Sequence, residues 1–227
     1  MNFSTLFRLG ENLNLDRKTL VYLRWIAIIG QFTAITFVYF YLKLGFLIVY
    51  AYLILLVGFI TNLYLQFRIK SISIKDFNAS MFLIYDLIQL TGLLYLTGGI
   101  SNPFTILIII PAIVSSTFLS RGTTIILGLL TIFFLFGLTV FHFPLPGIHE
   151  QSLTFPKLYL TGFIIAIIIG LVFLCYFGIR FSGESKRRTD AINKVQQVLA
   201  KEYELESLGG QAAAAAHSLG TPLATIN

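Results

Sequence analysis

The feature that most constrains this chain is the collection of its apolar residues into six long blocks. They cover about residues 24–42, 45–67, 79–97, 104–120, 123–142 and 157–181. Each block is long enough to cross a hydrocarbon core of roughly 30 Å as a helix, in which the backbone polar groups bond to one another. With 56% hydrophobic and 11% charged residues, we expect an all-α membrane protein with six transmembrane helices.

The lysines and arginines that flank these blocks predict the orientation. Only Lys43 and Lys157 fall on one side of the membrane. The other side receives Arg8, Arg17, Lys18, Arg24, Arg68, Lys70, Lys75, Arg121, Arg180, Lys186, Arg187 and Arg188. By the positive-inside rule both termini are cytoplasmic. Because the basic residues flank spans, the net charge of +6 indicates contact with membrane lipid and no nucleic-acid partner.

The polar character of the sequence divides the chain into four parts. Residues 1–23 read as a cytoplasmic segment without a cleavable signal, and 24–181 as a six-helix membrane domain. Residues 182–210 form a helical connector, and 211–227 begin a further helix. Apolar residues at three- and four-residue spacing in the connector favour a short parallel coiled coil, and hence a homodimer; a solvated single helix is the alternative.

His217 follows an alanine-rich run, which favours a helix that continues into the histidine. Pro222 lacks the N–H that the Ser218 carbonyl expects, so we predict a loosened helix beside an accessible imidazole. A neutral imidazole near pH 7 can act as a nucleophile toward phosphorus. His217 is therefore a candidate phosphoryl acceptor.

The run from His217 to Leu223, HSLGTPL, resembles the H-box of sensor histidine kinases, and its continuation to Ile226 is similar to the RegB/PrrB/ActS branch of redox-responsive kinases. The resemblance implies that His217 is phosphorylated within a motif marked by Thr221 and Pro222. It also implies a two-component system with a cytoplasmic response regulator, in a bacterial inner membrane. Ser218 departs from the family, which usually has an acid there to help deprotonate the imidazole.

A second motif joins the third and fourth blocks, where residues 98–104 read GGISNPF. Gly98 and Gly99 allow close approach of a planar ligand, Asn102 offers a donor and an acceptor, Pro103 opens the next helix, and Phe104 provides a ring. A tight interhelical turn is the competing interpretation. The segment resembles the GGxxNPF signature of RegB-like sensors, which implies that these five residues bind ubiquinone or a related quinone.

Other polar residues carry weaker indications. Asp86 and Gln89 share a face of the third block, where Asp86 is either functional or a packing contact. His142, His149 and Glu150 could bind a metal, but they read more simply as loop residues, and no metal site is expected. Cys175 has no partner cysteine and reads as a small apolar filler.

No glycine-rich phosphate loop occurs in these 227 residues, so ATP is expected to act only through a domain absent from this chain. Two alternatives stay open beside a membrane redox sensor that signals through His217. A small six-span transporter or channel would carry ionisable residues in several spans. A truncated, non-catalytic sensor would only pair with an intact kinase.

Overall fold

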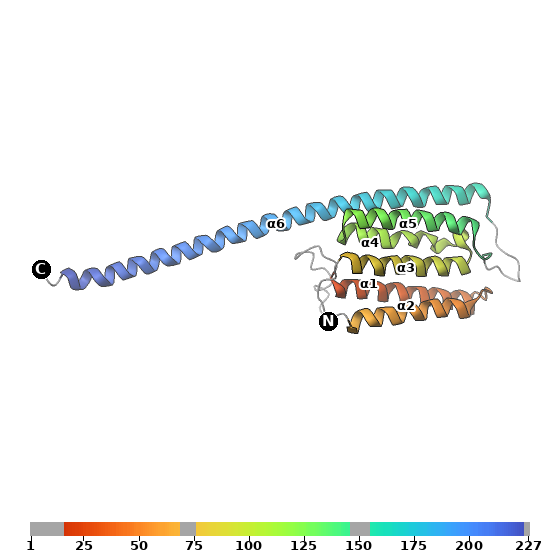
Figure 1. Cartoon of the computed structure of the whole chain (residues 1–227), viewed down its shortest axis with the longest axis horizontal. Helices are drawn as coiled ribbons and strands as arrows, with labels where there is room; N and C mark the ends of the chain where they lie inside the picture. The colour runs from red at the N-terminus through yellow and green to blue at the C-terminus, as the bar shows by residue number, and fades with distance from the viewer. Residues whose placement is uncertain (1–15, 69–75, 146–154, 225–227) are drawn as a thin grey trace. The chain divides into compact units, whose positions relative to one another are not determined.

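The computed structural model describes residues 16–68, 76–145 and 155–224, and every regular element within these ranges is a helix (Figure 1). The α-helices are α1 (Arg17–Thr36), α2 (Ile48–Arg68), α3 (Asp76–Leu96), α4 (Ile110–Phe118), α5 (Arg121–Val140) and α6 (Lys157–Ala224). A π-helical segment, η2 (Phe37–Tyr41), ends α1, and two 3-10 helices, η3 (Gly99–Ser101) and η4 (Pro103–Ile109), precede α4. The chain forms two compact units, Met1–Ser182 and Gly183–Asn227.

The helix boundaries follow from local chemistry. Asp76 places a carboxylate in the first turn of α3, where it complements the helix dipole. Gly98 continues the chain after α3 in a left-handed conformation, with φ of 112°. The Ser120 side chain accepts a hydrogen bond from the Thr123 N–H and caps α5. Pro103 occupies the first position of η4, where a missing N–H costs nothing.

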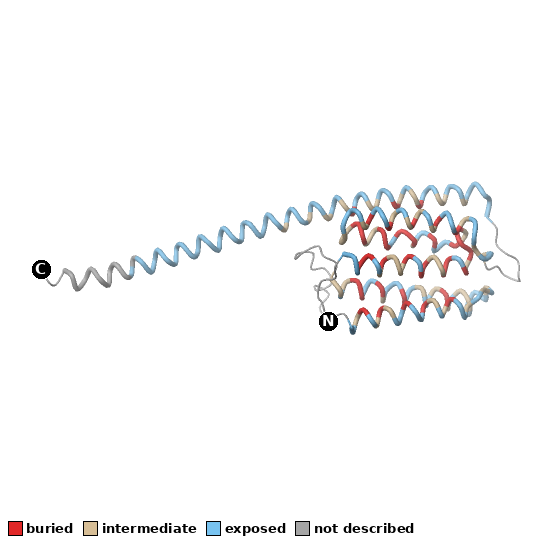
Figure 2. Tube along the Cα trace, in the orientation of Figure 1, coloured by how far each residue is buried: buried red, intermediate tan, exposed pale blue. Residues whose placement is uncertain are grey.

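Helix α3 is the centre of the first unit. It packs against α2 on one side and against α4 and α5 on the other, while α1 packs against α2 (Figure 1). Half of the most apolar window of α3 is buried, against 11–28% in the other long helices. Figure 2 shows the same concentration of buried residues along α3 and its neighbours.

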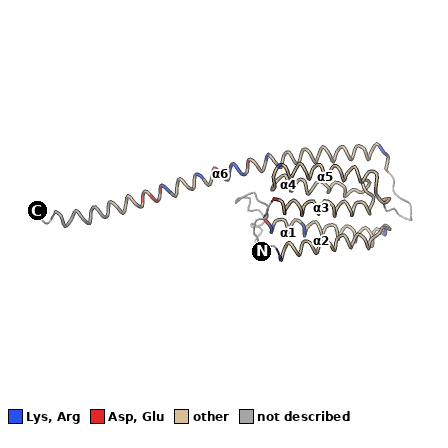
Figure 3. Tube along the Cα trace, viewed as in Figure 1, with Lys and Arg blue, Asp and Glu red and all other residues tan. Residues whose placement is uncertain are grey.

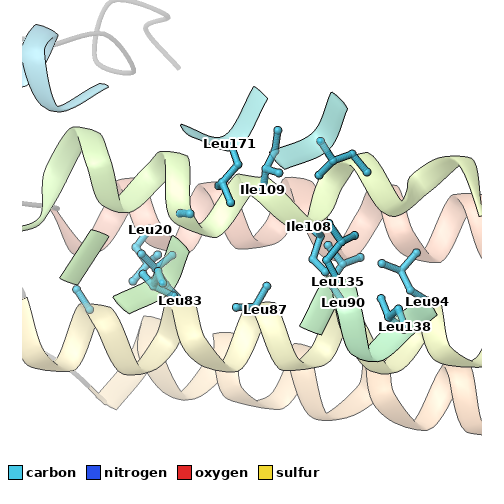
Figure 4. Close-up of a cluster of buried hydrophobic side chains, with 14 of the residues drawn as sticks. Leu20, Leu83, Leu87, Leu90, Leu94, Ile108, Ile109, Leu135, Leu138 and Leu171 are labelled. Atoms are coloured by element: carbon cyan, nitrogen blue, oxygen red, sulfur yellow. The ribbon is translucent and has the colours of Figure 1, made fainter. Parts of the chain in front are cut away.

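The main core follows one face of α3. Leu83, Leu87, Leu90 and Leu94 are spaced three or four residues apart and are buried against neighbouring helices (Figure 4). Their partners in this core include Leu20 of α1, Ile108 and Ile109 of η4, Leu135 and Leu138 of α5, and Ile167 and Leu171 of α6.

Large apolar side chains also cover the outside of this unit. Ile26, Phe133 and Leu158 are 69%, 70% and 85% exposed, a surface suited to lipid and not to water. Charged residues gather toward the helix ends (Figure 3). The all-α fold and the membrane character are thus confirmed.

The number of spans is less simple than the six apolar blocks indicate. Within the described ranges five helices are long and apolar enough to cross a membrane, and the fourth block corresponds to a shorter apolar segment, Pro103–Phe118. The first helix begins at Arg17 and not near residue 24. Arg24, which we assigned to the flanking basic residues, therefore lies two turns inside α1 and is only 3% exposed.

Two ends of the bundle can be distinguished by their contacts. At the basic end, Arg17 Nη1 donates to the Gln66 carbonyl (2.8 Å), and the Ser120 N–H donates to Asp76 Oδ2 (3.0 Å). At the opposite end, here called the turn end, the Phe143 N–H donates to the Tyr95 carbonyl (2.9 Å). Residues 98–104 lie at the turn end.

Candidate functional site

The two glycines of the 98–104 turn are required by its geometry. Gly98 and Gly99 have φ of 112° and 55°. A Cβ on Gly98 would lie 2.5–2.9 Å from Leu145, and one on Gly99 would lie 2.5–2.7 Å from His142 and the Leu138 carbonyl. Both positions are closed to a side chain, so the glycines allow the segment after α5 to pack directly on the turn.

Asn102 holds the turn together from inside. Its Nδ2 donates to the Thr97 carbonyl (3.0 Å) and to Thr97 Oγ1 (2.7 Å), while its Oδ1 accepts from the Phe104 N–H (2.9 Å). The residue is 8% exposed. Both amide protons are therefore engaged, and the contacts give Asn102 a structural role as a cap, whereas its ligand role stays a prediction.

The segment after Asn102 is fixed on its inner side and exposed on its outer side. Thr105 Oγ1 donates to the Gly99 carbonyl (2.7 Å), which ties η4 back onto the glycine pair. Pro103 opens η4, and the Phe104 side chain is 46% exposed. The exposure of Phe104 leaves its ring open to contact, and its ligand role stays a prediction.

An apolar groove of about 320 Å³ lies between α3 and α5 near the turn. It is lined by Ile88, Thr91, Gly92, Tyr95, Phe134, Gly137, Leu138 and Phe141. Leu138 connects the groove to the turn, because its carbonyl is the atom that a Cβ on Gly99 would meet. Sequence analysis missed the groove, since Gly92 and Gly137 come together only through helix packing.

Tyr95 is the lining residue of the groove that carries a phenolic hydroxyl. Its ring meets Phe143 edge-on, with 5.3 Å between the ring centroids, and the residue is 41% exposed. Among the described residues its hydroxyl has no hydrogen-bond partner, whereas Thr91 Oγ1 donates to the Leu87 carbonyl (2.7 Å). The groove therefore has almost wholly apolar walls, which suit a planar apolar molecule, and Tyr95 in its lining has a hydroxyl without a partner among the described residues.

A separate polar cluster lies between α1, α2 and α3. Arg24 Nε donates to Asp86 Oδ1 (2.8 Å), and Arg24 Nη2 donates to Thr61 Oγ1 (2.9 Å). The guanidinium carbon lies 5.3 Å and 5.4 Å from the ring centroids of Phe82 and Tyr85. Asp86 thus has a buried cationic partner. The sequence did not predict this pair, because Arg24 stands at the edge of an apolar block and was read as a flanking charge.

Gln89 extends the polar contacts one turn further along α3. Its Nε2 donates to Gln31 Oε1 of α1 (3.0 Å). A Cβ on Gly58 of α2 would overlap the Gln89 carboxamide, so the glycine makes room for this contact. Asp86 and Gln89 share a helix face, as predicted, and both join α3 to α1.

The H-box-like motif lies in the second unit. The backbone of His217, Thr221 and Pro222 is helical and belongs to the last turns of α6. The connector helix is continuous from Gly183, and its apolar residues Ile192 and Val195 are 57% and 59% exposed. The roles of the three motif residues and the coiled-coil pairing stay predictions.

The remaining candidates have modest roles in the described part of the chain. His142 Nδ1 lies 2.8 Å from the Phe143 carbonyl, whereas His149 and Glu150 fall outside the described residues. Among the described residues no group of three potential metal ligands occurs. Cys175 is half-buried against the core, in keeping with a filler.

Comparison with known proteins shows that the chain is similar to sensor histidine kinases. Two relatives from Cereibacter sphaeroides, both named sensor histidine kinase RegB, are 40% identical to it over 210 and 215 residues. Each match covers 92% of this chain and 46% of the relative, so the chain spans about half the length of these relatives. No family model and no solved structure match the chain. The similarity confirms the RegB-type resemblance that the motifs indicated.

Proposed function

The chain is a relative of the RegB-type sensor histidine kinases, and we propose that it forms the membrane sensor portion of such a two-component kinase. The observation that carries the proposal is 40% identity over 92% of the chain, joined to an H-box at His217. The transporter alternative predicts ionisable groups in several spans. Within the described spans the charged side chains that lie away from the helix ends are Arg24 and Asp86, which neutralise each other.

We propose six membrane crossings, with both termini in the cytoplasm of a bacterium. The short segment Pro103–Phe118 can serve as the fourth crossing because part of it is a 3-10 helix. Seven residues in η4 and nine in α4 give a length of about 27 Å, against about 24 Å for an α-helix of the same size. This length is close to the roughly 30 Å hydrocarbon thickness.

The input is the redox state of a membrane quinone, bound in the groove between α3 and α5. The Tyr95 hydroxyl donates to a quinone carbonyl, and Gly92 and Gly137 leave room for the planar ring. Of the turn residues Gly98, Gly99, Asn102, Pro103 and Phe104, Gly99 lies next to the groove, where a Cβ would meet the Leu138 carbonyl, and the other four support the turn around it. In this arrangement Asn102 holds the turn in shape, and Tyr95, in place of Asn102, donates the hydrogen bond to the quinone.

The output is phosphorylation of His217 and transfer of the phosphoryl group to a response regulator aspartate. Thr221 and Pro222 shape the helix beside the acceptor. ATP binding and the kinase chemistry belong to a domain outside these 227 residues, and the acting form is a homodimer paired through the connector.

Labelling with radioactive ATP tests the output. The chain in lipid vesicles, supplied in trans with the ATP-binding domain of a RegB-type kinase, is expected to incorporate phosphate at His217. His217→Gln should remove the label, with Ser218→Ala as the neighbouring control. Equal labelling of His217→Gln and the unmodified chain would refute the assigned acceptor.

A ubiquinone photo-probe tests the input site. Gly137→Leu fills the groove without an internal clash, because a Cβ there meets nothing within 4 Å. Gly128→Leu is the matched control, on the same helix, also with open space, and outside the groove. We expect a loss of labelling of at least fivefold in Gly137→Leu alone. Undiminished labelling of Gly137→Leu would exclude the groove.

A further inference from the structure

The segment Pro103–Phe118 combines two helix types, and Pro111 lies where they meet. Pro111 has no N–H to donate to the Leu107 carbonyl, as an α-helix would require. The Ile110 N–H donates to that carbonyl instead, which is the three-residue spacing of a 3-10 helix. Seven residues of 3-10 helix exceed the usual three or four, so the geometry itself marks this segment as a place where the helix type can change.

We propose that the segment η4–α4 changes length and thereby couples the 98–104 turn to α6. The proposal rests on the quinone-sensing function above, and it assigns Pro111, Ser116 and Gly178 as positioning residues. Three features support it: one end of the segment is fixed to the turn, the other end contacts α6, and the part between has an alternative helical form.

The turn end of the segment is fixed by hydrogen bonds to the glycine pair and its cap. Thr105 Oγ1 donates to the Gly99 carbonyl (2.7 Å), and the Phe104 N–H donates to Asn102 Oδ1 (2.9 Å). Ile108 is fully buried in the same core as Leu138. A ligand that displaces the turn or Leu138 therefore acts directly on η4.

The other end of the segment contacts α5 and α6 through small side chains. The Ser115 hydroxyl of α4 and the Thr124 hydroxyl of α5 form a hydrogen bond (3.1 Å). Ser116 lies against Gly178 of α6, where an added Cβ would overlap the Ser116 hydroxyl and lie 3.4 Å from Thr117 Oγ1. Because Ser116 lies directly against the α6 backbone at Gly178, a shift or rotation of Ser116 acts directly on α6.

The size of the conversion is sufficient for signalling. Changing the seven residues of η4 from 3-10 to α-helix shortens the segment by about 3.5 Å and adds a rotation of about 140° distributed along it. Helix shifts of about 1–2 Å at packed interfaces already serve as regulatory transitions. Gly178 precedes the connector by only four residues, and α6 is one continuous helix to Ala224.

Distance measurement tests the conversion without reference to quinone. Spin labels on cysteines at positions 104 and 119, in a Cys175→Ala background, report the length of the segment in lipid nanodiscs. Pro111→Ala restores the N–H and should shorten the mean distance by about 3 Å. An unchanged distance in Pro111→Ala would overturn the proposal, whatever the kinase output.

Kinase output tests the coupling. In the chain supplied with an ATP-binding domain, we compare His217 labelling with oxidised and with reduced ubiquinone, and measure photo-probe binding in parallel. Gly178→Val should reduce the oxidised-to-reduced ratio at least threefold while probe binding stays within twofold. Gly170→Val is the control, because Gly170 lies on the same helix with nothing within 4 Å.

A second substitution separates contact from misfolding. Ser116→Gly removes the hydroxyl that the larger side chain of Gly178→Val would strike, so the double variant Ser116→Gly with Gly178→Val should recover part of the quinone response. A wild-type response retained in Gly178→Val would overturn the coupling. Absence of both probe binding and response in the unmodified chain would instead refute the proposed sensing function.

Discussion

Removing the Asp86 carboxylate is expected to destabilise the bundle more than removing the Arg24 guanidinium. Arg24 is 3% exposed, whereas the Asp86 side chain is 24% exposed. A carboxyl group left alone can bind a proton and become neutral, but a guanidinium keeps its charge. Asp86→Leu therefore leaves a buried cation, while Arg24→Met leaves a group that can be neutralised.

The contacts set the expected magnitudes. Breaking a buried ion pair by removing one partner costs about 3–5 kcal/mol. Arg24 lies seven residues into α1, about 10 Å from its start, so its long side chain can partly relax toward the basic end, and we expect about 3 kcal/mol for Asp86→Leu. Arg24→Met should cost about 1–2 kcal/mol, because the thioether preserves much of the packing against Phe82 and Tyr85.

The double substitution provides the decisive comparison. Arg24→Met with Asp86→Leu removes both charges and should cost no more than about 1–2 kcal/mol, which gives a coupling energy of about 2–3 kcal/mol. Unfolding by sodium dodecyl sulfate in mixed micelles, followed by circular dichroism, measures each variant. Fluorescence of Trp25, the single tryptophan, reports the same region locally. Additive effects of the two single substitutions would refute the reasoning.

Two further predictions concern the turn. Asn102→Ala removes three hydrogen bonds and should destabilise the bundle by about 2–3 kcal/mol in the same unfolding assay, and full stability would contradict the capping role. Gly99→Ala forces a Cβ against His142 at φ of 55° and should lower the melting temperature in detergent. Gly162→Ala, a helical glycine with open space, should be neutral or stabilising.

The sequence predicted the elements well wherever a local chemical signal marks them. Long apolar blocks identified the helices, and GGISNPF identified a turn with a glycine stop and a proline start. These signals are local because a left-handed residue, an N-cap and a missing N–H act within a few residues. The 3-10 helix η4 at the start of the fourth apolar block was missed, because no local signal before Pro111 marks it.

Tertiary pairing explains what the sequence could not predict. Arg24 stands at the first position of the first apolar block as we delimited it, about residues 24–42, so charge counting placed it at the membrane surface. Its burial depends on Asp86 and Thr61, which are distant in sequence. The groove likewise depends on α3 and α5 packing side by side, with Gly92 and Gly137 both in its lining, which neither helix indicates by itself.

The distribution of polar contacts in the bundle also indicates which part can move. Helices α1, α2 and α3 are joined by a buried ion pair and by side-chain amides, contacts that demand specific geometry and resist sliding. The contact of α4 with α6 is made by Ser116 and Gly178, and the one with α5 includes a pair of hydroxyl groups. Small side chains permit close packing but hold no charge in place, so a shift there breaks few strong interactions. The groove borders α5, and the 98–104 turn borders α5 and leads into η4. We therefore expect ligand-dependent motion on that side of α3, with α1 and α2 as the fixed reference.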